Sequence, residues 1–144
     1  MTDSELDRGA TGCDHLDDIE LLARFEALAL APADFRHREH LRLAFAVLRG
    51  ADFGEAAVRL RRGLRRFADA AGVPGRYHET LTWAYLAVVA RRMAEDPALA
   101  SSHELLARHP DLADHRGGAV ARYYDVDAIT ASPLARAVFV LPDR

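Results

Sequence analysis

Four amphipathic stretches separated by glycine and proline constrain the fold of this chain more than any other feature. In each stretch, apolar residues recur every three or four positions, the period of an α-helix that is buried along one side. Segments that favour helix ends interrupt this pattern at 29–34, 50, 72–75 and 96–97. No stretch of useful length shows the strict alternation of a half-buried strand. The sequence therefore predicts an all-α fold.

The expected main helices cover about residues 17–29, 35–49, 54–71 and 74–95. Asp34 is a good N-cap for the second of them. Ser101 with Glu104 indicates a short helix, and Ser132-Pro133 indicates the first residues of a last one. Because short connections make successive helices antiparallel, we expect a single-domain up-and-down bundle of four helices with short C-terminal helices packed on it. The second and fourth helices would then begin at the same end.

Length and composition bound the function. The 144 residues suffice for one domain, expected over 17–144, after a polar and acidic segment, 1–16, that is expected to be a flexible tail. A formal net charge of −3 gives no reason to expect nucleic acid as a partner. No apolar run reaches the roughly 18–20 residues of a membrane span, no signal peptide is recognisable, and the single Cys13 excludes an internal disulfide. We expect a soluble cytoplasmic protein without a membrane partner.

Three histidines are the strongest functional signal. Since each helical residue advances about 100° around the axis, His37 and His40 share the apolar face of the second helix. His78 lies on the apolar face of the fourth, near its start. In a bundle whose second and fourth helices are parallel, the three imidazoles converge inside one end. Such a cluster suits a single divalent transition metal with a position left open for water or substrate, and the sequence does not rank zinc, iron and copper.

Other polar residues complete the expected site. Glu79 lies at the edge of the same face and is the candidate for an extra ligand or a general base, whereas Glu39 is expected to face solvent. The other candidates are aromatic, hydroxyl and basic side chains from the fourth helix and the last third of the chain. Those expected to take part in catalysis are Tyr77 and Tyr123, and those expected to bind substrate are Thr82, Tyr85, Arg122 and Tyr124.

Four short motifs occur together: F-x-H-x-x-H-L at 35–41, Y-H-x-T-x-T at 77–82, R-Y-Y at 122–124 and F-V-x-P at 139–142. Their combination resembles a family of small, largely uncharacterised bacterial all-helical proteins, and the likeness spans about residues 25–143. The resemblance implies a helical fold but names no substrate. The residues that it highlights are Phe35, His37, His40, Tyr77, His78, Thr80 and Thr82.

The first hypothesis is therefore a metal-dependent enzyme that acts on a small molecule. The second is a non-catalytic ligand- or partner-binding module with structural histidines, in which the arginines of residues 59–66 form the contact surface; otherwise these arginines are a solvated face. The third is metal-free acid–base catalysis by the histidines and Glu79. The sequence indicates no oligomeric state. The remaining histidines, expected to be exposed, are His15, His103, His109 and His115.

Overall fold

A computed structural model describes residues 12–143, and within this range the chain forms helices, turns and loops but no strand. The helices are α2 (Asp18–Glu26), α3 (His37–Arg49), α4 (Phe53–Ala70), α5 (Glu79–Glu95), α6 (Ser102–Arg108), α7 (Val126–Ala131) and α8 (Pro133–Ala137). Short 3-10 turns connect them: η1 (Pro32–Asp34), η2 (Pro74–Arg76), η3 (Pro110–Leu112) and η4 (Val120–Arg122). The predicted all-α class is confirmed. None of the helices in 12–143 has the length and apolar character that crossing a membrane requires.

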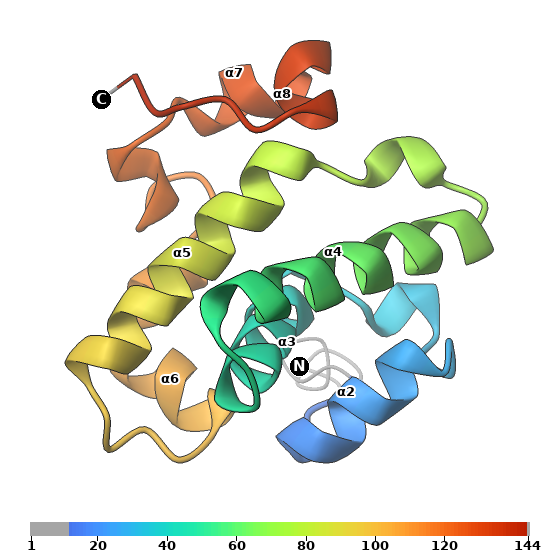
Figure 1. Cartoon of the computed structure of the whole chain (residues 1–144), viewed down its shortest axis with the longest axis vertical. Helices are drawn as coiled ribbons and strands as arrows, with labels where there is room; N and C mark the ends of the chain where they lie inside the picture. Colours follow the sequence, from blue (N-terminus) through green and yellow to red (C-terminus); the bar gives the residue numbers. More distant parts are fainter. Residues whose placement is uncertain (1–11, 144) are drawn as a thin grey trace, which may run out of the picture.

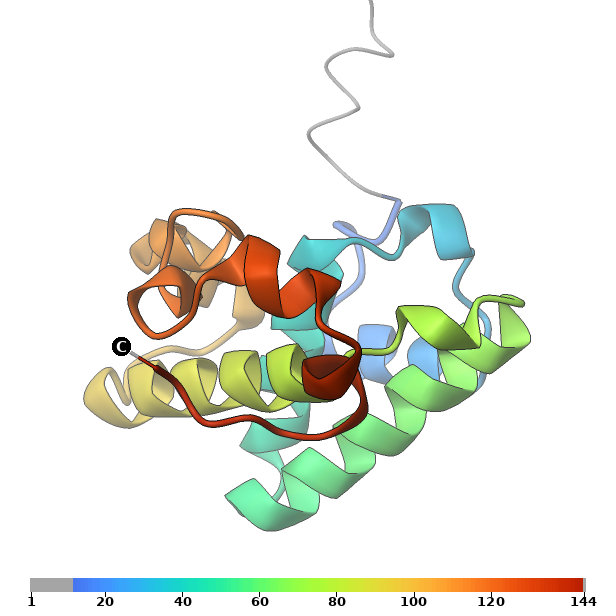
Figure 2. The ribbon, with the colours of Figure 1, turned by 90° about the horizontal axis from the view of Figure 1, so that it is seen from above.

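The helix α3 lies at the centre and contacts α2, α4, α5 and α6. Its buried residues include Leu41, Leu43, Phe45 and Val47, which at about 100° per residue lie on more than one side of the helix. Neighbours therefore pack around α3 from several directions. Figure 1 looks nearly along α3 while α4 and α5 run across the view, and Figure 2 shows α3 crossing α5. The predicted parallel course of these two helices, as in an up-and-down bundle, is wrong.

Two of the three helix N-caps predicted from the sequence are confirmed and one is wrong. Ser101 accepts a hydrogen bond from the backbone of Glu104, and Ser132 does the same at the start of α8, as predicted. Asp34 is not the N-cap of α3 but lies in η1. The helix begins after Arg36, whose backbone N–H donates to the Glu39 carboxylate at 2.9 Å. Glu39 is fully buried, so its expected exposure is wrong.

The helix α2 is buried on one side only. Ile19 is 82% exposed and Leu28 is 38% exposed, whereas Leu21 and Phe25, one turn apart, are buried. Phe25 packs on α4 at Gly63, where an added Cβ would lie 2.4 Å from the phenylalanine ring. A glycine is needed there because any side chain would push α2 away from α4.

The flexible tail predicted for residues 1–16 lies mostly outside the described residues. Residues 1–11 lie outside the described range, so the prediction for 1–16 is tested only in its last part. There Cys13 and Leu16 are each only 2% exposed and belong to the hydrophobic core. This part of the chain is therefore packed on the domain and not a flexible tail.

Arg42 holds this segment in place from the centre of the fold. Its side chain is fully buried, and its two terminal nitrogens donate to the carbonyls of Cys13 at 2.8 Å and Leu16 at 2.6 Å. Its Nε donates to Ser102 Oγ at 2.8 Å, and the Asp18 carboxylate lies 3.6 Å from the guanidinium. One side chain of α3 thus joins the N-terminal segment and the first residues of α2 and α6.

We predict that Arg42→Ala lowers the free energy of unfolding by about 3–5 kcal/mol, because it leaves buried acceptors without their donor. Urea denaturation followed by circular dichroism measures the loss. The control is Arg62→Ala, an exposed position on α4, where the change should stay within about 0.5 kcal/mol. Equal losses in the two variants would contradict the anchoring role of Arg42.

Candidate functional site

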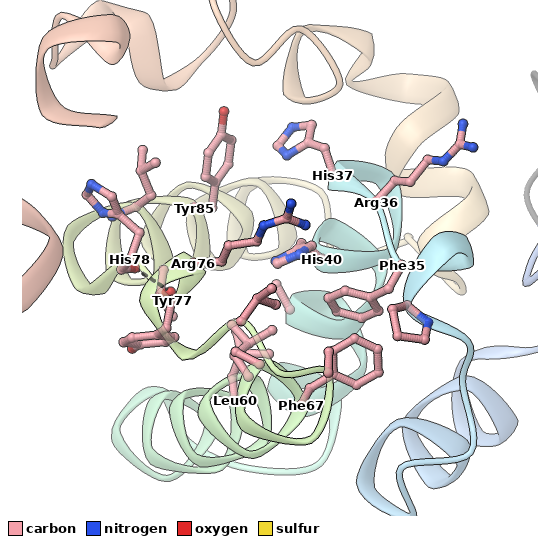
Figure 3. A pocket seen from close by; sticks show the side chains of 18 of the residues that line it. Phe35, Arg36, His37, His40, Leu60, Phe67, Arg76, Tyr77, His78 and Tyr85 are labelled. Atoms are coloured by element: carbon pink, nitrogen blue, oxygen red, sulfur yellow. Dashed lines mark hydrogen bonds between the residues drawn. The ribbon is translucent and has the colours of Figure 1, made fainter. Parts of the chain in front are cut away.

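A pocket with a volume of about 540 Å³ lies where the starts of α3 and α5 meet the second half of α4. This volume is typical of sites for small organic ligands. Leu60, Phe67 and Phe35 lie on one side of the pocket, and His37 and Tyr85 lie on the other (Figure 3). The pocket therefore has an apolar side next to α4 and a polar side next to the start of α3 and to α5.

Part of the predicted site lines this pocket. The residues that do so are His37, His40, Tyr77, His78, Thr82 and Tyr85. They come together although α3 and α5 are not parallel, because the first turn of α3 lies over the second turn of α5. The rings of His37 and Tyr85 are in contact there, with centroids 4.8 Å apart.

The predicted residues of the last third lie elsewhere. Tyr124 is buried in a separate apolar cluster on α5 and donates its hydroxyl to the carbonyl of Val140 at 2.8 Å. Tyr123 is 38% exposed, and Arg122 lies 3.9 Å from the Asp111 carboxylate. None of the R-Y-Y residues lines the pocket. Their predicted roles in catalysis and substrate binding are not supported, because the segment packs on α5 and not over the site.

His78 is the N-cap of α5, and both of its ring nitrogens are engaged. Nδ1 accepts a hydrogen bond from the backbone N–H of Leu81 at 3.1 Å. Nε2 lies 2.7 Å from the carbonyl oxygen of Ile129, which only accepts, so Nε2 carries the proton. A metal would have to displace one of these bonds. Across residues 12–143, no group of three or more His, Cys, Asp or Glu side chains is placed to hold a metal ion. The geometry gives the predicted three-histidine centre no support.

Glu79 lies beside the pocket but not in its lining. Its carboxylate accepts hydrogen bonds from Tyr77 at 2.5 Å, Arg61 at 2.9 Å and Trp83 at 3.3 Å. Burial raises the pKa of Glu79, but the Tyr77 and Arg61 hydrogen bonds outweigh it and lower the pKa overall. A carboxylate that is ionised and bonded by three donors orients Tyr77 and is poorly suited to act as a general base.

The arginines of α4 pair with neighbouring helices more than the sequence suggested. Arg59 binds Glu26 of α2 at 2.6 Å, and Arg61 binds Glu79 of α5. The Arg65 guanidinium lies over the Tyr77 ring, 5.4 Å from its centroid. Some arginines of this face thus connect α4 to α2 and α5, whereas Arg62 remains exposed. The contact surface stays a prediction.

His115 belongs to the site, and sequence reasoning missed it. Its Nδ1 lies 2.7 Å from the Tyr85 hydroxyl, and its ring centroid lies 5.0 Å from that of His37. Nε2 of His37 in turn donates to the carbonyl of Leu112 at 2.9 Å. The expected exposure of His115 is wrong because the loop between η3 and η4 folds back over α5. No local sequence signal reveals that path.

His40 differs from the other pocket histidines. Its side chain is exposed, through the pocket, and its ring lies 4.4 Å from that of Phe35. Within 12–143 its nitrogens have no hydrogen-bond partner. Although the ring is open to the pocket, desolvation by the surrounding walls, reinforced by His37 and His115, lowers the pKa of His40 to about 4. Its imidazole is therefore neutral near pH 7.

The charged side chains that line the pocket are all basic. Arg36, Arg76 and Arg136 line it, and no Asp or Glu does, although the whole chain carries a formal charge of −3. Arg136 is engaged, since it donates to the backbone carbonyls of Gly75 and Thr130 at 2.9 and 2.8 Å. Arg36 and Arg76 form no ion pair with any carboxylate of the described range. Two guanidinium groups are thus available in a pocket without a counterion.

No family model, curated protein or solved structure matches this chain. The family resemblance of the four motifs therefore stays a prediction. The function has to be inferred from the geometry of the pocket.

We predict that His78→Ala lowers the free energy of unfolding by about 1–2 kcal/mol, because α5 loses its N-cap. His78→Asn should recover part of this loss, since asparagine caps helices well. Urea denaturation with and without a chelator measures both effects. A loss of stability in wild type on chelation that both variants abolish would show instead that His78 binds a metal.

We also predict that stability falls as the pH decreases from about 6.5 toward 5. Desolvation by the protein lowers the pKa of His37, His40, His78 and His115 below the usual value for histidine, about 6.5. The unfolded chain therefore binds more protons in this range and is favoured. The loss should be roughly 1 kcal/mol in total, because the exposure of His40 reduces its share. Urea unfolding at several pH values measures it, and a flat profile would contradict neutral pocket histidines.

Proposed function

We propose that the pocket binds a small organic anion, namely a carboxylate attached to an apolar body. The single observation that carries this proposal is a lining that contains three arginines and four histidines but no Asp or Glu, next to an apolar wall. A neutral or cationic ligand would leave Arg36 and Arg76 without a partner. Pockets that combine a mostly apolar lining with a few convergent polar groups are typical of small-molecule sites.

The anionic group would bind at the polar side. Arg36 immediately precedes α3, and Arg76 lies three residues before α5. A guanidinium matches a carboxylate with two parallel hydrogen bonds. The starts of α3 and α5 add partial positive charge near the same space. In Figure 3 the guanidinium of Arg76 extends toward His40, whereas that of Arg36 points away from it, so Arg76 is the arginine placed to bind the anionic group first.

The apolar body would lie against α4. Leu60, Leu64 and Phe67 contribute this wall, and Phe35 extends it with its ring centroid 4.5 Å from that of Phe67. Burial of apolar ligand surface contributes roughly 25 cal/mol per Å². An aliphatic or aromatic tail therefore supplies binding energy, whereas the charged group supplies orientation.

A metal-dependent enzyme, the first hypothesis from sequence, has less support. A cation would enter a pocket lined by arginines with no carboxylate to offset them, and the nitrogens of His78 are engaged. Binding of zinc, iron or copper remains a prediction. Elemental analysis of tag-free protein tests it: near one equivalent, lost in the double variant His37→Ala/His78→Ala, would restore that hypothesis.

The proposal predicts that octanoate binds and that its neutral analogue octanamide binds at least tenfold more weakly. Arg76→Gln should weaken octanoate binding by about tenfold, the lower end of what one charge-assisted hydrogen bond contributes, and should leave octanamide unaffected. Isothermal titration calorimetry measures both ligands. Arg62→Gln removes an exposed arginine outside the pocket and is the matched control. Equal affinity for acid and amide, or equal effects of the two variants, would overturn the proposal.

A further inference from the structure

Among the pocket histidines, only the ring of His40 forms no hydrogen bond within residues 12–143. Within the described residues, His37 is bound to the Leu112 carbonyl and His115 to the Tyr85 hydroxyl. His78 is bound at both nitrogens. The ring of His40 is held by Phe35 on one side and faces the pocket. It is therefore fixed in position but free to accept or donate a hydrogen bond to a ligand.

The surroundings of His40 contain no group that would stabilise its protonated form. From α3 and from the loop between η3 and η4 it faces His37 and His115, which offer no negative charge and lower its pKa further through the repulsion between protonated rings. From α4 it faces apolar side chains. The other polar and charged residues of the lining come from the start of α3, from η2, from α5 and the residues just before it, and from α8. They are Arg36, Arg76, Tyr77, His78, Thr82, Tyr85 and Arg136.

A bound carboxylate would supply the missing counterion. It would neutralise the field of Arg36 and Arg76 and place an acceptor oxygen in the space that His40 faces. A hydrogen bond between an imidazolium and a carboxylate is roughly twice as strong as one between neutral groups. The protonated ring therefore gains more from the ligand than the neutral ring does.

We propose that His40 takes up one proton when the pocket binds its carboxylate, so that the imidazolium donates a hydrogen bond to the anion and binding tightens as the pH falls. This inference rests on the proposed function and specifies how the charge of that same site is regulated. The proton comes from solvent and adds to a free nitrogen of His40, while the ligand stays ionised and loses nothing. No other bond forms or breaks.

The direction of the pH dependence follows from the linkage between ligand binding and proton binding. Between the pKa of His40 in the free protein and its higher value in the complex, affinity rises by up to tenfold for each unit that the pH falls. Above the higher value affinity no longer depends on this group. Since carboxylic acids themselves become protonated near about pH 4–5, the effect is measured above that range.

Nuclear magnetic resonance tests the inference on the full chain. Imidazole resonances are titrated with and without saturating octanoate, and the His40 signal is assigned as the one missing from His40→Gln. We expect its titration midpoint to rise by at least two pH units in the complex, because only then does the pH-dependent range extend above that in which the ligand itself is protonated. His15→Gln, which removes an exposed histidine outside the pocket, should leave this signal and its shift unchanged.

Calorimetry at several pH values provides the second readout. Wild-type affinity for octanoate should fall as the pH rises, and that of His40→Gln should be nearly constant above about pH 5.5. Octanoate binding that depends on Arg76 but leaves the His40 midpoint unmoved would overturn this inference and leave the proposed function intact. Persistence of the full pH dependence in His40→Gln would also overturn it. Absence of any octanoate binding would overturn both.

Discussion

The buried guanidinium of Arg42 is the interaction on which the rest of the structure depends. A fully buried charge is tolerated only when acceptors surround it, and here these acceptors come from Cys13, Leu16 and Ser102. Satisfying the charge therefore brings two separate parts of the chain, the segment 13–16 and the start of α6, onto α3. Arg42 lies two residues after His40, about 200° around the helix. The side of α3 that anchors the fold is thus opposite to the side that forms the pocket, and anchoring one side fixes the position of the other.

The pocket separates residues that shape it from residues that are free to bind. Hydrogen bonds to the protein hold His37, His78 and the pair formed by Tyr85 and His115. These groups are oriented, and their hydrogen-bonding capacity is partly or wholly used. Arg36, Arg76 and His40 line the same space without such partners, apart from one long bond of Arg36 to a carbonyl at 3.4 Å. All three side chains are open to solvent, so a ligand that binds here replaces water around them and has to offer acceptor atoms and negative charge in its place.

Sequence reasoning found half of this site, partly for the wrong reason. The helical period placed His37 and His40 on the inner side of α3 correctly, but their meeting with His78 was deduced from a parallel α3 and α5, whereas the two helices cross. Arg36 and Arg76 could have been predicted from the sequence, because each lies next to a histidine-containing motif at a helix start. The position of His115 and the burial of Glu39 could not have been predicted, since both depend on how distant segments pack. The R-Y-Y residues lie outside the pocket lining, which the sequence did not reveal, because a buried tyrosine with a bonded hydroxyl looks the same in sequence as one that binds substrate.

Whether the pocket suits a metal ion or an anion depends on which imidazole nitrogens already form hydrogen bonds within the protein. Periodicity tells which histidines face inward, but not whether a carbonyl or a backbone N–H already occupies the ring. Both ring nitrogens of His78 are hydrogen-bonded, and the residue caps α5. Within the described residues, neither ring nitrogen of His40 is hydrogen-bonded. A neutral ring among arginines repels cations less than an imidazolium would, yet it offers them no counterion. The same ring becomes an additional donor once an anion is present. The lack of any carboxylate in the lining therefore favours the binding of anions in two ways. It leaves the arginines without an ion-pair partner, and it makes the charge of His40 depend on the ligand.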